Sequence, residues 1–252
     1  MPDKNLHIVC HDVPYPPDYG GVFDLFYKIR TLHEEGIRIH LHCFEYGRGQ
    51  QPVLNDYCEK VYYYPRRTGH KGLSYRLPYI VCSRSNPELL DRLLEDDYPI
   101  LLEGVHCTYL MNDARFAGRK VFLRLHNVES VYYHQLAACT SSWFKKLYYL
   151  HESSVLKKYE QRIAAHWPLL AVRDSDAEVA KTAYRSKEVT VIPVFLPYQD
   201  VECPQGTGCY CLYHGNLSVE ENEKAVCWLL ENVFDDLPLP FLIAGKNPSS
   251  HL

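Results

Sequence analysis

The hydrophobic positions of the first fifty residues follow a strand, then a helix, then a strand. Leu6–Cys10 is a short apolar run typical of a buried strand. Apolar residues then recur at helical spacing, and Gly36 provides a stop signal; they are Val22, Leu25, Phe26, Ile29 and Leu32. Residues 37–44 alternate apolar and polar side chains, which predicts a second strand. The order strand, Gly-Gly loop, helix, strand predicts a right-handed βαβ crossover.

The same alternation continues to about residue 192. Strands are predicted at 61–64, 99–102, 121–125, 169–172 and 189–192. Helices are predicted at 87–95, 128–138, 143–165 and 175–184, with Ser175 as the N-cap of the last one. In helix 143–165 five apolar residues fall roughly along one face: Phe144, Tyr148, Val155, Tyr159 and Ile163. Strands separated by helices predict an α/β fold with a Rossmann-like, doubly wound parallel sheet.

The composition shifts at residues 197–208, where Pro and Gly accumulate and the periodic pattern stops. After this stretch we predict a strand at 209–213, a turn at 214–216, a helix at 219–233 and a strand at 241–244. Strand, helix and strand alone cannot cover both faces of a parallel sheet. We therefore expect an N-terminal domain at 1–196, a linker at 197–208 and, at 209–252, the incomplete start of a second Rossmann-like domain.

Composition narrows the class of protein without identifying it. The net charge of −4 gives no electrostatic reason to expect a nucleic-acid partner. The first residues do not form a signal peptide, and no apolar run is long enough to span a membrane. Ten cysteines without a CxxC pair indicate reduced thiols in a cytoplasmic protein rather than disulfides or a zinc site.

Polar residues follow three predicted strands and point to a site at the edge of the sheet. His126 and Asn127 end the strand 121–125, Glu103 and Gly104 follow another strand, and Gly20–Gly21 precede the first helix. In open α/β sheets ligands bind at the carboxyl ends of the strands. Glycines there let the backbone approach a ligand, and a histidine can act as acid, base or hydrogen-bonding group. The alternative for each position is an ordinary polar turn.

Two segments are rich in basic residues. The first contains Arg66, Arg67, His70, Lys71, Arg76 and Arg84. The second is segment 143–162, which begins with Trp143 and Phe144; five basic residues against two acidic ones give it a net charge of +3. Beside Trp143 and Phe144, the basic residues of the second segment are compatible with a contact with anionic lipid headgroups. A solvated helix face with extended lysines is the alternative.

Five stretches in this order carry a family likeness: HDVPYPPDYGG at 11–21, LRLHNVES at 123–130, VTVIPVFLP at 189–197, YHGNLSVEEN at 213–222 and FLIAGKNPS at 241–249. The sequence resembles the bacterial glycosyltransferases of family 4, which have the GT-B architecture of two Rossmann-like domains. The resemblance implies transfer of a sugar from a nucleotide-diphosphate sugar to a glycan or lipid-linked acceptor. It also implies retention at the anomeric carbon, no essential metal, and a role in surface polysaccharide or glycolipid synthesis.

The resemblance also assigns roles to residues. Gly20 and Gly21 match the family's glycine loop near the donor phosphates and the acceptor. His126 matches the histidine that hydrogen-bonds the donor sugar, and we take it as the catalytic candidate. Gly215 and Asn216 match the first loop of the second domain, which faces the donor diphosphate. Asn127 and Glu103 complete the predicted substrate-binding set.

The sequence departs from the family in two places. Many relatives have G-R-L-x-x-x-K-G where this chain has GNLSVEEN, so both phosphate-binding cations are absent. The family's acidic donor-binding motif would lie beyond Leu252. We therefore expect little or no transfer activity from these 252 residues alone. The alternatives are a non-catalytic remnant that acts as a binding module and a nucleotide-sugar epimerase of the same architecture. A peripheral contact of segment 143–162 with the inner face of the membrane is a further expectation.

Overall fold

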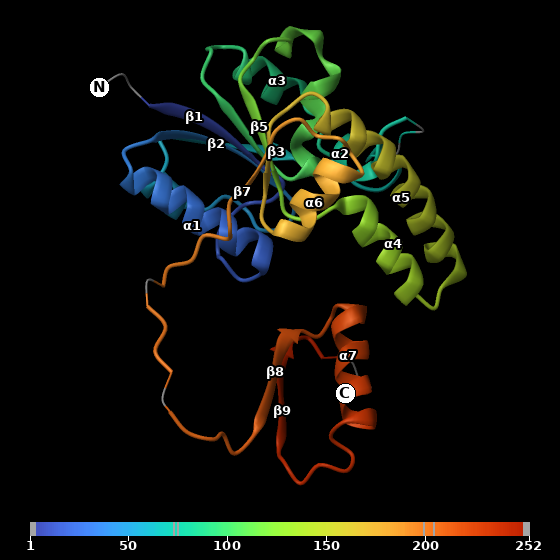
Figure 1. Ribbon diagram of the computed structural model, residues 1–252. Helices are drawn as coiled ribbons and strands as arrows, with labels where there is room; N and C mark the ends of the chain where they lie inside the picture. Colours follow the sequence, from blue (N-terminus) through green and yellow to red (C-terminus); the bar gives the residue numbers. More distant parts are fainter. Residues whose placement is uncertain (1–3, 73, 75, 199, 204, 249–252) are drawn as a thin grey trace. The chain divides into compact units, whose positions relative to one another are not determined.

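A computed structural model describes residues 4–72, 74, 76–198, 200–203 and 205–248 (Figure 1). The chain divides into two compact units. The first consists of the described residues within Met1–Tyr133 and His151–Gln199, and the second of those within His134–Leu150 and Asp200–Leu252. The domain and linker boundaries expected from the sequence stay a prediction.

The first unit is built on a seven-stranded sheet in which every neighbouring pair of strands is parallel. Its strands are β1 (Asn5–Cys10), β2 (Arg38–Glu45), β3 (Lys60–Pro65), β4 (Ile100–Glu103), β5 (Val121–Leu125), β6 (Leu169–Ala171) and β7 (Val189–Val191). The order across the sheet is β3-β2-β1-β4-β5-β6-β7. The predicted doubly wound parallel sheet is confirmed, and all seven strands were predicted from the sequence.

Helices connect these strands. The α-helices are α1 (Gly20–Glu34), α2 (Tyr79–Cys82), α3 (Pro87–Leu93), α4 (Glu129–Cys139), α5 (Trp143–Ala164) and α6 (Asp174–Thr182). Short 3₁₀ segments lie at η1 (Pro52–Asp56), η2 (Gly69–Gly72), η3 (Val105–Asn112) and η4 (Ala114–Phe116). The sequence pattern did not predict α2 or the 3₁₀ segments. Helix α2 has four residues and is too short to show a helical period, and 3₁₀ segments have about three residues per turn instead of 3.6.

The two faces of the sheet pack against different helices (Figure 1). Helix α1 covers one face, where Leu25 and Ile29 pack against Ile8 and Leu41 of the strands. On the other face α2, α3, η3, α5 and α6 contribute to a larger core that includes Val9. Neighbouring residues of β1 therefore point to opposite faces, as the period of a strand requires. Both faces are covered, which explains why these strands are nearly continuous apolar runs.

The order of the strands locates the crevice of the sheet. The chain proceeds outward from β1 through β2 to β3 and then returns to place β4 on the other side of β1. The carboxyl ends of β1 and β4 therefore flank the topological switch point, where open α/β sheets bind ligands. The register places Cys10 beside Glu103 and Glu103 beside Arg124. Paired residues of parallel strands point to the same face, so Glu103 and Arg124 both face α1.

Several predicted boundaries differ from the structure by one or more residues, and three of these differences change the interpretation of a loop, a cap or a turn. Helix α1 begins at Gly20, because the Phe23 amide already donates to the Tyr19 carbonyl (2.9 Å), so the two glycines form its first turn rather than a preceding loop. Helix α6 begins at Asp174 with Arg173 as its N-cap, and Ser175 lies inside the first turn. Asp174 and Asp176 there are favourably placed near the positive end of the helix dipole.

The third error concerns the second unit, in which strand β8 (Cys211–Asn216) begins two residues later than predicted and runs through the predicted turn. Its ladder with β9 (Phe241–Lys246) extends to the pair Asn216 and Lys246. Helix α7 (Glu220–Asn232) connects the two parallel strands. The predicted strand, helix and strand are thus present. A Cβ on Gly245 would collide with the carbonyl oxygen of Gly215, so glycine is required where these strands meet.

The predicted apolar face of α5 is only partly buried. Tyr159 and Ile163 lie in the core, whereas Phe144 is 69% exposed and Tyr148 is also exposed. The first two turns of the helix therefore present their apolar residues to solvent. Among the residues that the structure describes, no helix combines the length and apolar character needed to cross a membrane.

A chain of hydrogen bonds joins polar side chains within the sheet. His7 Nε2 lies 3.0 Å from Asp96 Oδ1, and His7 Nδ1 lies 2.9 Å from His42 Nε2. The other nitrogen of His42 lies 2.9 Å from the hydroxyl of Tyr64. Burial, assisted by the neighbouring His7 and His40, lowers the pKa of His42 well below its ordinary value of 6.5. His42 therefore stays neutral in the folded protein at pH values where the unfolded chain takes up a proton.

This difference predicts a loss of stability in mild acid. Below pH 6.5 the unfolded state binds a proton at His42 and the folded state does not, so the free energy of unfolding falls as the pH falls. Replacement His42→Gln should remove this contribution, about 1 kcal/mol between pH 7.5 and 5.5. The measurement is urea denaturation of both proteins at the two pH values. Equal changes in the two proteins would contradict the prediction.

Candidate active site

Helix α1 carries two charged residues on its buried face. Asp24 and Lys28 are one helical turn apart, so both point in the direction of Leu25 and Ile29, toward the sheet. Their exposed fractions are only 2% and 3%. Buried charges are costly unless they are paired, so their partners determine whether this part of the fold is stable.

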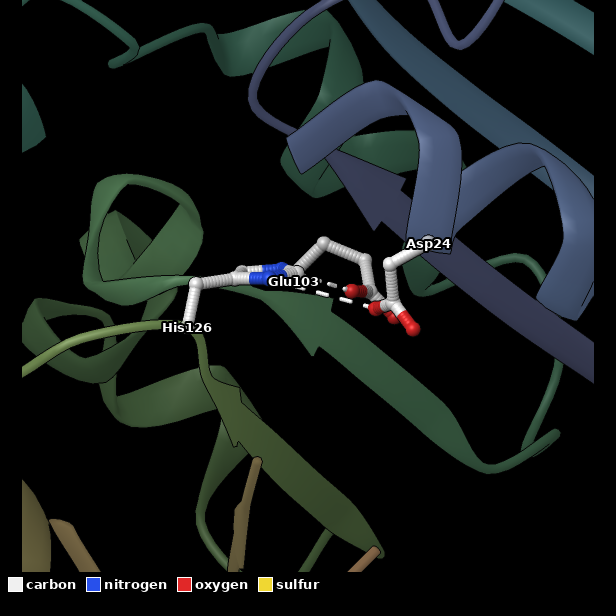
Figure 2. Close-up of side chains that lie close together, drawn as sticks. All are labelled: Asp24, Glu103 and His126. Atoms are coloured by element: carbon white, nitrogen blue, oxygen red, sulfur yellow. Dashed lines mark hydrogen bonds and ion pairs between the residues drawn. The ribbon is translucent and has the colours of Figure 1, made fainter. Parts of the chain in front are cut away.

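The partners are Glu103 on β4 and Arg124 on β5. Figure 2 shows Asp24 and Glu103 close to each other and to His126. Lys28 Nζ lies 2.8 Å from Glu103 Oε2 and 3.3 Å from Asp24 Oδ2. Arg124 holds Asp24 through two hydrogen bonds, from Nε to Oδ2 (3.0 Å) and from Nη2 to Oδ1 (2.9 Å). We refer to Asp24, Lys28, Glu103 and Arg124 as the charge network. Two carboxylates and two cations balance one another, and all four side chains are buried.

The charge network also fixes the segment that follows β7. Arg124 donates to the carbonyl oxygens of Ile192 (3.1 Å) and Pro193 (3.0 Å). The Phe195 amide donates to Asp24 Oδ1 at 2.8 Å. Three residues thus contact Asp24: Lys28 of the same helix, Arg124 of β5 and Phe195, which follows β7.

His126 is the member of this site that reaches solvent. It follows β5, its side chain is 16% exposed, and its Nε2 lies 3.0 Å from Glu103 Oε2. A carboxylate can only accept, so Nε2 carries the proton and donates it to Glu103. In the neutral ring Nδ1 is then the acceptor. Nδ1 makes no hydrogen bond to the described residues, and it lies 3.9 Å from Asp24 Oδ2.

Two further histidines lie beside His126. The ring of His11, which follows β1, is 5.8 Å from the ring of His126 and 5.3 Å from that of His106. Gly104 has a φ of 84°, which favours glycine, and a Cβ there would lie 3.2 Å from His106 Nδ1. The Nδ1 atoms of His11 and His106 are sealed from solvent and have no hydrogen-bond partner among the described residues.

The pKa values in this site follow from burial and the neighbouring charges. Burial would raise the pKa of Glu103, but Lys28 and His126 outweigh it and lower the pKa to about 2. Burial also opposes the ionisation of Asp24, and Lys28 and Arg124 lower its pKa. Burial, then the charges of His126 and Arg84, lowers the pKa of His11 to about 3. Both carboxylates are thus ionised at neutral pH, and His11 is neutral.

The arrangement of Asp24, Glu103 and His126 also raises the question of a metal. One donor atom from each lies within 4.8 Å of the others. However, Lys28 and Arg124 already bind both oxygens of Asp24, and Lys28 shares Glu103 Oε2 with His126. A divalent cation would have to displace the buried ammonium of Lys28. The residues therefore do not fit a resident metal, and we assign none.

The other predicted residues are placed as follows. Gly20 and Gly21 form the first turn of α1, and a Cβ on Gly21 would lie 3.6 Å from His11 Nε2, so this glycine adjoins the histidines. Asn127 is exposed in the turn between β5 and α4. The structure thus brings His126 and Glu103 into contact, with Gly21 near the same histidine cluster.

Gly215 and Asn216 lie in the second unit, at the end of β8. The side-chain oxygen of Asn216 accepts from the Ser218 amide (3.1 Å) and from the Ser218 hydroxyl (2.8 Å). The carbonyl of Asn216 accepts from the Asn222 side chain at 2.9 Å. These bonds shape the connection to α7. A role for Gly215 and Asn216 toward a donor diphosphate stays a prediction.

Sequence reasoning missed Asp24, Lys28 and Arg124. Two signals were present: opposite charges four residues apart on an otherwise apolar helix face, and a single arginine inside the apolar strand 121–125. Neither signal names its partner, because Asp24 and Arg124 are separated by 100 residues.

No protein-family model matches the chain. Its sequence is similar to an uncharacterised 44.6 kDa protein in the cps region of Klebsiella pneumoniae, with 28% identity over 233 residues. The match covers 90% of this chain and 59% of that protein, so the chain spans about three fifths of the length of this curated relative.

Two solved structures resemble the fold. Arabidopsis thaliana UGT89C1 complexed with UDP-L-rhamnose is 13% identical, with a TM-score of 0.52; the match covers 98% of this chain and 66% of that one. MurG of Acinetobacter baumannii is 13% identical, with a TM-score of 0.49 and coverage of 95% and 57%. The likeness to UGT89C1 shows that the chain has the fold of GT-B glycosyltransferases. Membership of family 4 stays a prediction.

The charge network predicts a strong dependence of stability on Asp24. Replacement Asp24→Asn removes the charge that compensates Arg124 and Lys28, and breaking a buried pair in this way costs about 3–5 kcal/mol. The control is Glu34→Gln on the same helix, which removes an exposed ion pair with Arg30 and should change stability little. Urea denaturation measures both. A small effect of Asp24→Asn would contradict a structural role for the network.

Proposed function

We propose that this chain is the acceptor-side part of a glycosyltransferase that uses a nucleotide-diphosphate sugar. The observation that carries the proposal is the position of His126. It lies at the carboxyl edge of β5, next to the switch point between β1 and β4, and the buried Glu103 orients its ring. This is where an α/β sheet of this topology receives a ligand.

The comparisons support the proposal at the level of the fold. UGT89C1 was solved with UDP-L-rhamnose, and the Klebsiella relative is named after its place in a cps region, which suggests polysaccharide synthesis. We extend both to this chain as proposals: a nucleotide-sugar donor, a glycan or lipid-linked acceptor, and a role in surface polysaccharide or glycolipid assembly. No specific feature of the described residues favours the binding module or the epimerase.

In the proposed reaction the bond between the anomeric carbon and the diphosphate breaks, and the acceptor hydroxyl attacks from the same face. The nucleoside diphosphate leaves, and the proton of the acceptor hydroxyl passes to the departing phosphate oxygen. Such a reaction depends on positioning and on stabilisation of the leaving group more than on a strong base. The charge network supplies the positioning, because its ion pairs hold α1, β4 and β5 in one arrangement.

His126 would contact the donor sugar through Nδ1. Its Nε2 proton is committed to Glu103, so Nδ1 presents a lone pair that can accept from a sugar hydroxyl. The ionised Glu103 keeps the ring in this tautomer, as a buried carboxylate does when it accepts from an imidazole. The contact at Nδ1 is therefore specific for a group that donates a hydrogen bond, such as a sugar hydroxyl. It would not require a protonated imidazole.

This role predicts that His126→Ala weakens donor binding in the complete protein. Loss of one oriented hydrogen bond should raise the dissociation constant of the accepted nucleotide-sugar about tenfold. The measurement is calorimetric titration with a panel of uridine-, guanosine- and thymidine-diphosphate sugars, followed by the transfer rate with the sugar that binds. His166→Ala is the control, because His166 is exposed and precedes β6 at the opposite edge of the sheet. If donor affinity and rate are unchanged in His126→Ala, His126 is not part of the site.

We also propose that the exposed face of α5 contacts an anionic membrane surface. Trp143, Phe144 and Leu147 are 61%, 69% and 55% exposed. Four lysines of the helix are exposed as well: Lys145, Lys146, Lys157 and Lys158. Glu152 and Glu160 do not offset them at the surface. They are buried and accept hydrogen bonds from the backbone amides of Tyr79 and of Glu129 and Ser130.

This surface predicts selective binding to anionic lipid. The complete protein should sediment with vesicles that contain phosphatidylglycerol and not with vesicles of phosphatidylcholine alone, because each surface lysine adds attraction to anionic headgroups. The double variant Trp143→Ser, Phe144→Ser should weaken sedimentation severalfold. Equal binding to both kinds of vesicle, or no effect of the double variant, would refute the proposed contact.

A further inference from the structure

Two arginines near the candidate site form no ion pair with a carboxylate of the described residues. Arg66 follows β3, and Arg84 lies between α2 and α3. The segments that carry them adjoin, since the amide of Arg67 donates to the carbonyl of Ser83 at 2.8 Å. Within the described part of the chain, no carboxylate oxygen lies within 4.0 Å of either guanidinium. We refer to Arg66 and Arg84 as the arginine pair.

Arg84 is buried without a counter-ion. It is 6% exposed, and its Nε and Nη1 donate to the carbonyl oxygens of His11 (2.9 Å) and Ile80 (3.0 Å). Its Nη2 has no acceptor among the described residues. Carbonyl dipoles orient the guanidinium, which forms no direct ion pair with a described carboxylate; the charge of Asp12 attracts it from a longer distance. Such an arrangement is costly in the empty protein and is relieved when an anion binds.

Arg66 is held by aromatic rings instead of by acids. The centre of its guanidinium lies 4.8 Å from the ring of Tyr46 and 5.9 Å from that of Tyr79. Its Nε is sealed from solvent and has no hydrogen-bond partner among the described residues. Aromatic faces orient an arginine without consuming its donors, so the planar fork remains available to an oxyanion.

The acidic groups near the arginine pair form no direct ion pair with it among the described residues. Asp12 accepts from the amide of Val13 (2.8 Å) and from the hydroxyl of Tyr19 (2.9 Å). Burial, then the charge of Glu160, raises the pKa of Glu129 to about 8, so this carboxyl is largely protonated at neutral pH. Burial and the charge of Arg66 lower the pKa of Arg84 to about 10, so Arg84 remains charged.

The arginine pair adjoins the catalytic candidate. Arg84 holds the carbonyl of His11, and the ring of His11 lies 5.8 Å from that of His126. All these residues belong to the first unit, at the carboxyl edge of its sheet. The side chains of His70 and Lys71, which belong to the same basic region of the sequence, lie outside the described residues.

We propose that Arg66 and Arg84 bind a phosphate group of the acceptor substrate, an inference that rests on the proposed transferase function. Two guanidinium groups without a direct ion-pair partner among the described residues match a phosphate monoester, which carries a charge of about −1.5 to −2 at pH 7. Arginine also binds phosphate through paired hydrogen bonds that are stronger than those between neutral groups. A carboxylate would leave one of the two charges unbalanced. The acceptor is thus a phosphorylated glycan or a lipid-linked phosphate.

The test is calorimetric titration of the complete protein with inorganic phosphate, in the absence of any donor. Arg66→Gln should weaken phosphate binding about tenfold or more, because it removes a charge-assisted bond. Arg84→Lys should weaken it as well, since an ammonium keeps the charge and loses the fork. The control is Arg67→Gln, which makes the same change in charge at the neighbouring exposed position and should alter binding by less than about twofold. Circular dichroism establishes that each variant is folded.

Titrations with two other anions test which chemical group the arginine pair binds. Acetate should bind at least about tenfold more weakly than phosphate, and saturating uridine diphosphate should leave phosphate affinity unchanged. Displacement by uridine diphosphate would assign the arginine pair to the donor and overturn the proposal. Equal losses in Arg66→Gln and Arg67→Gln, or acetate binding as tight as phosphate, would overturn it too. Because the titration requires neither donor nor turnover, its failure is distinct from a failure of His126→Ala to affect donor binding.

Discussion

The bidentate ion pair between Asp24 and Arg124 is the interaction on which the rest of this site depends. It connects the first helix to the fifth strand across 100 residues, and the same carboxylate accepts the amide of Phe195 beyond the last strand of the sheet. Lys28 forms ion pairs with both Asp24 and Glu103, so it joins Glu103 to this pair. The attraction among these four charges offsets the cost of removing them from water only when all four are in place. The network therefore favours a single arrangement of α1, β4 and β5.

The network also explains how a single histidine is presented at the sheet edge. The carboxylate of Glu103 is buried and ionised between Lys28 and His126, and it fixes the ring and its tautomer. The positive φ of Gly104 directs the chain away from the strand, and the absent side chain leaves room for His106. The orientation of His126 at the edge of the sheet therefore depends on buried residues beneath it.

The distribution of charge differs between the two basic regions. Along α5 the acidic residues point inward to cap backbone amides, and the lysines remain at the surface, where water solvates them. In the arginine pair the positive charge is partly buried and has no acidic partner within the described residues. Solvated lysines fit a diffuse anionic surface, whereas buried guanidinium groups fit a discrete oxyanion. The loop Gly215–Asn222, by contrast, contains no cation.

The amino-acid sequence by itself determined the class of fold. Apolar residues recur with a period of about two in a half-buried strand and 3.6 in an amphipathic helix, and this spacing is visible locally. It also placed Glu103 and His126 at strand ends, since the ends of apolar runs are visible locally. The start of α1 at Gly20 and the extent of β8 through Asn216 depended on hydrogen bonds to other segments. Only the tertiary structure joined Asp24 to Arg124 and Arg84 to His11. Those contacts are set by strand order and register, and a single sequence carries no local signal of which distant residues will meet.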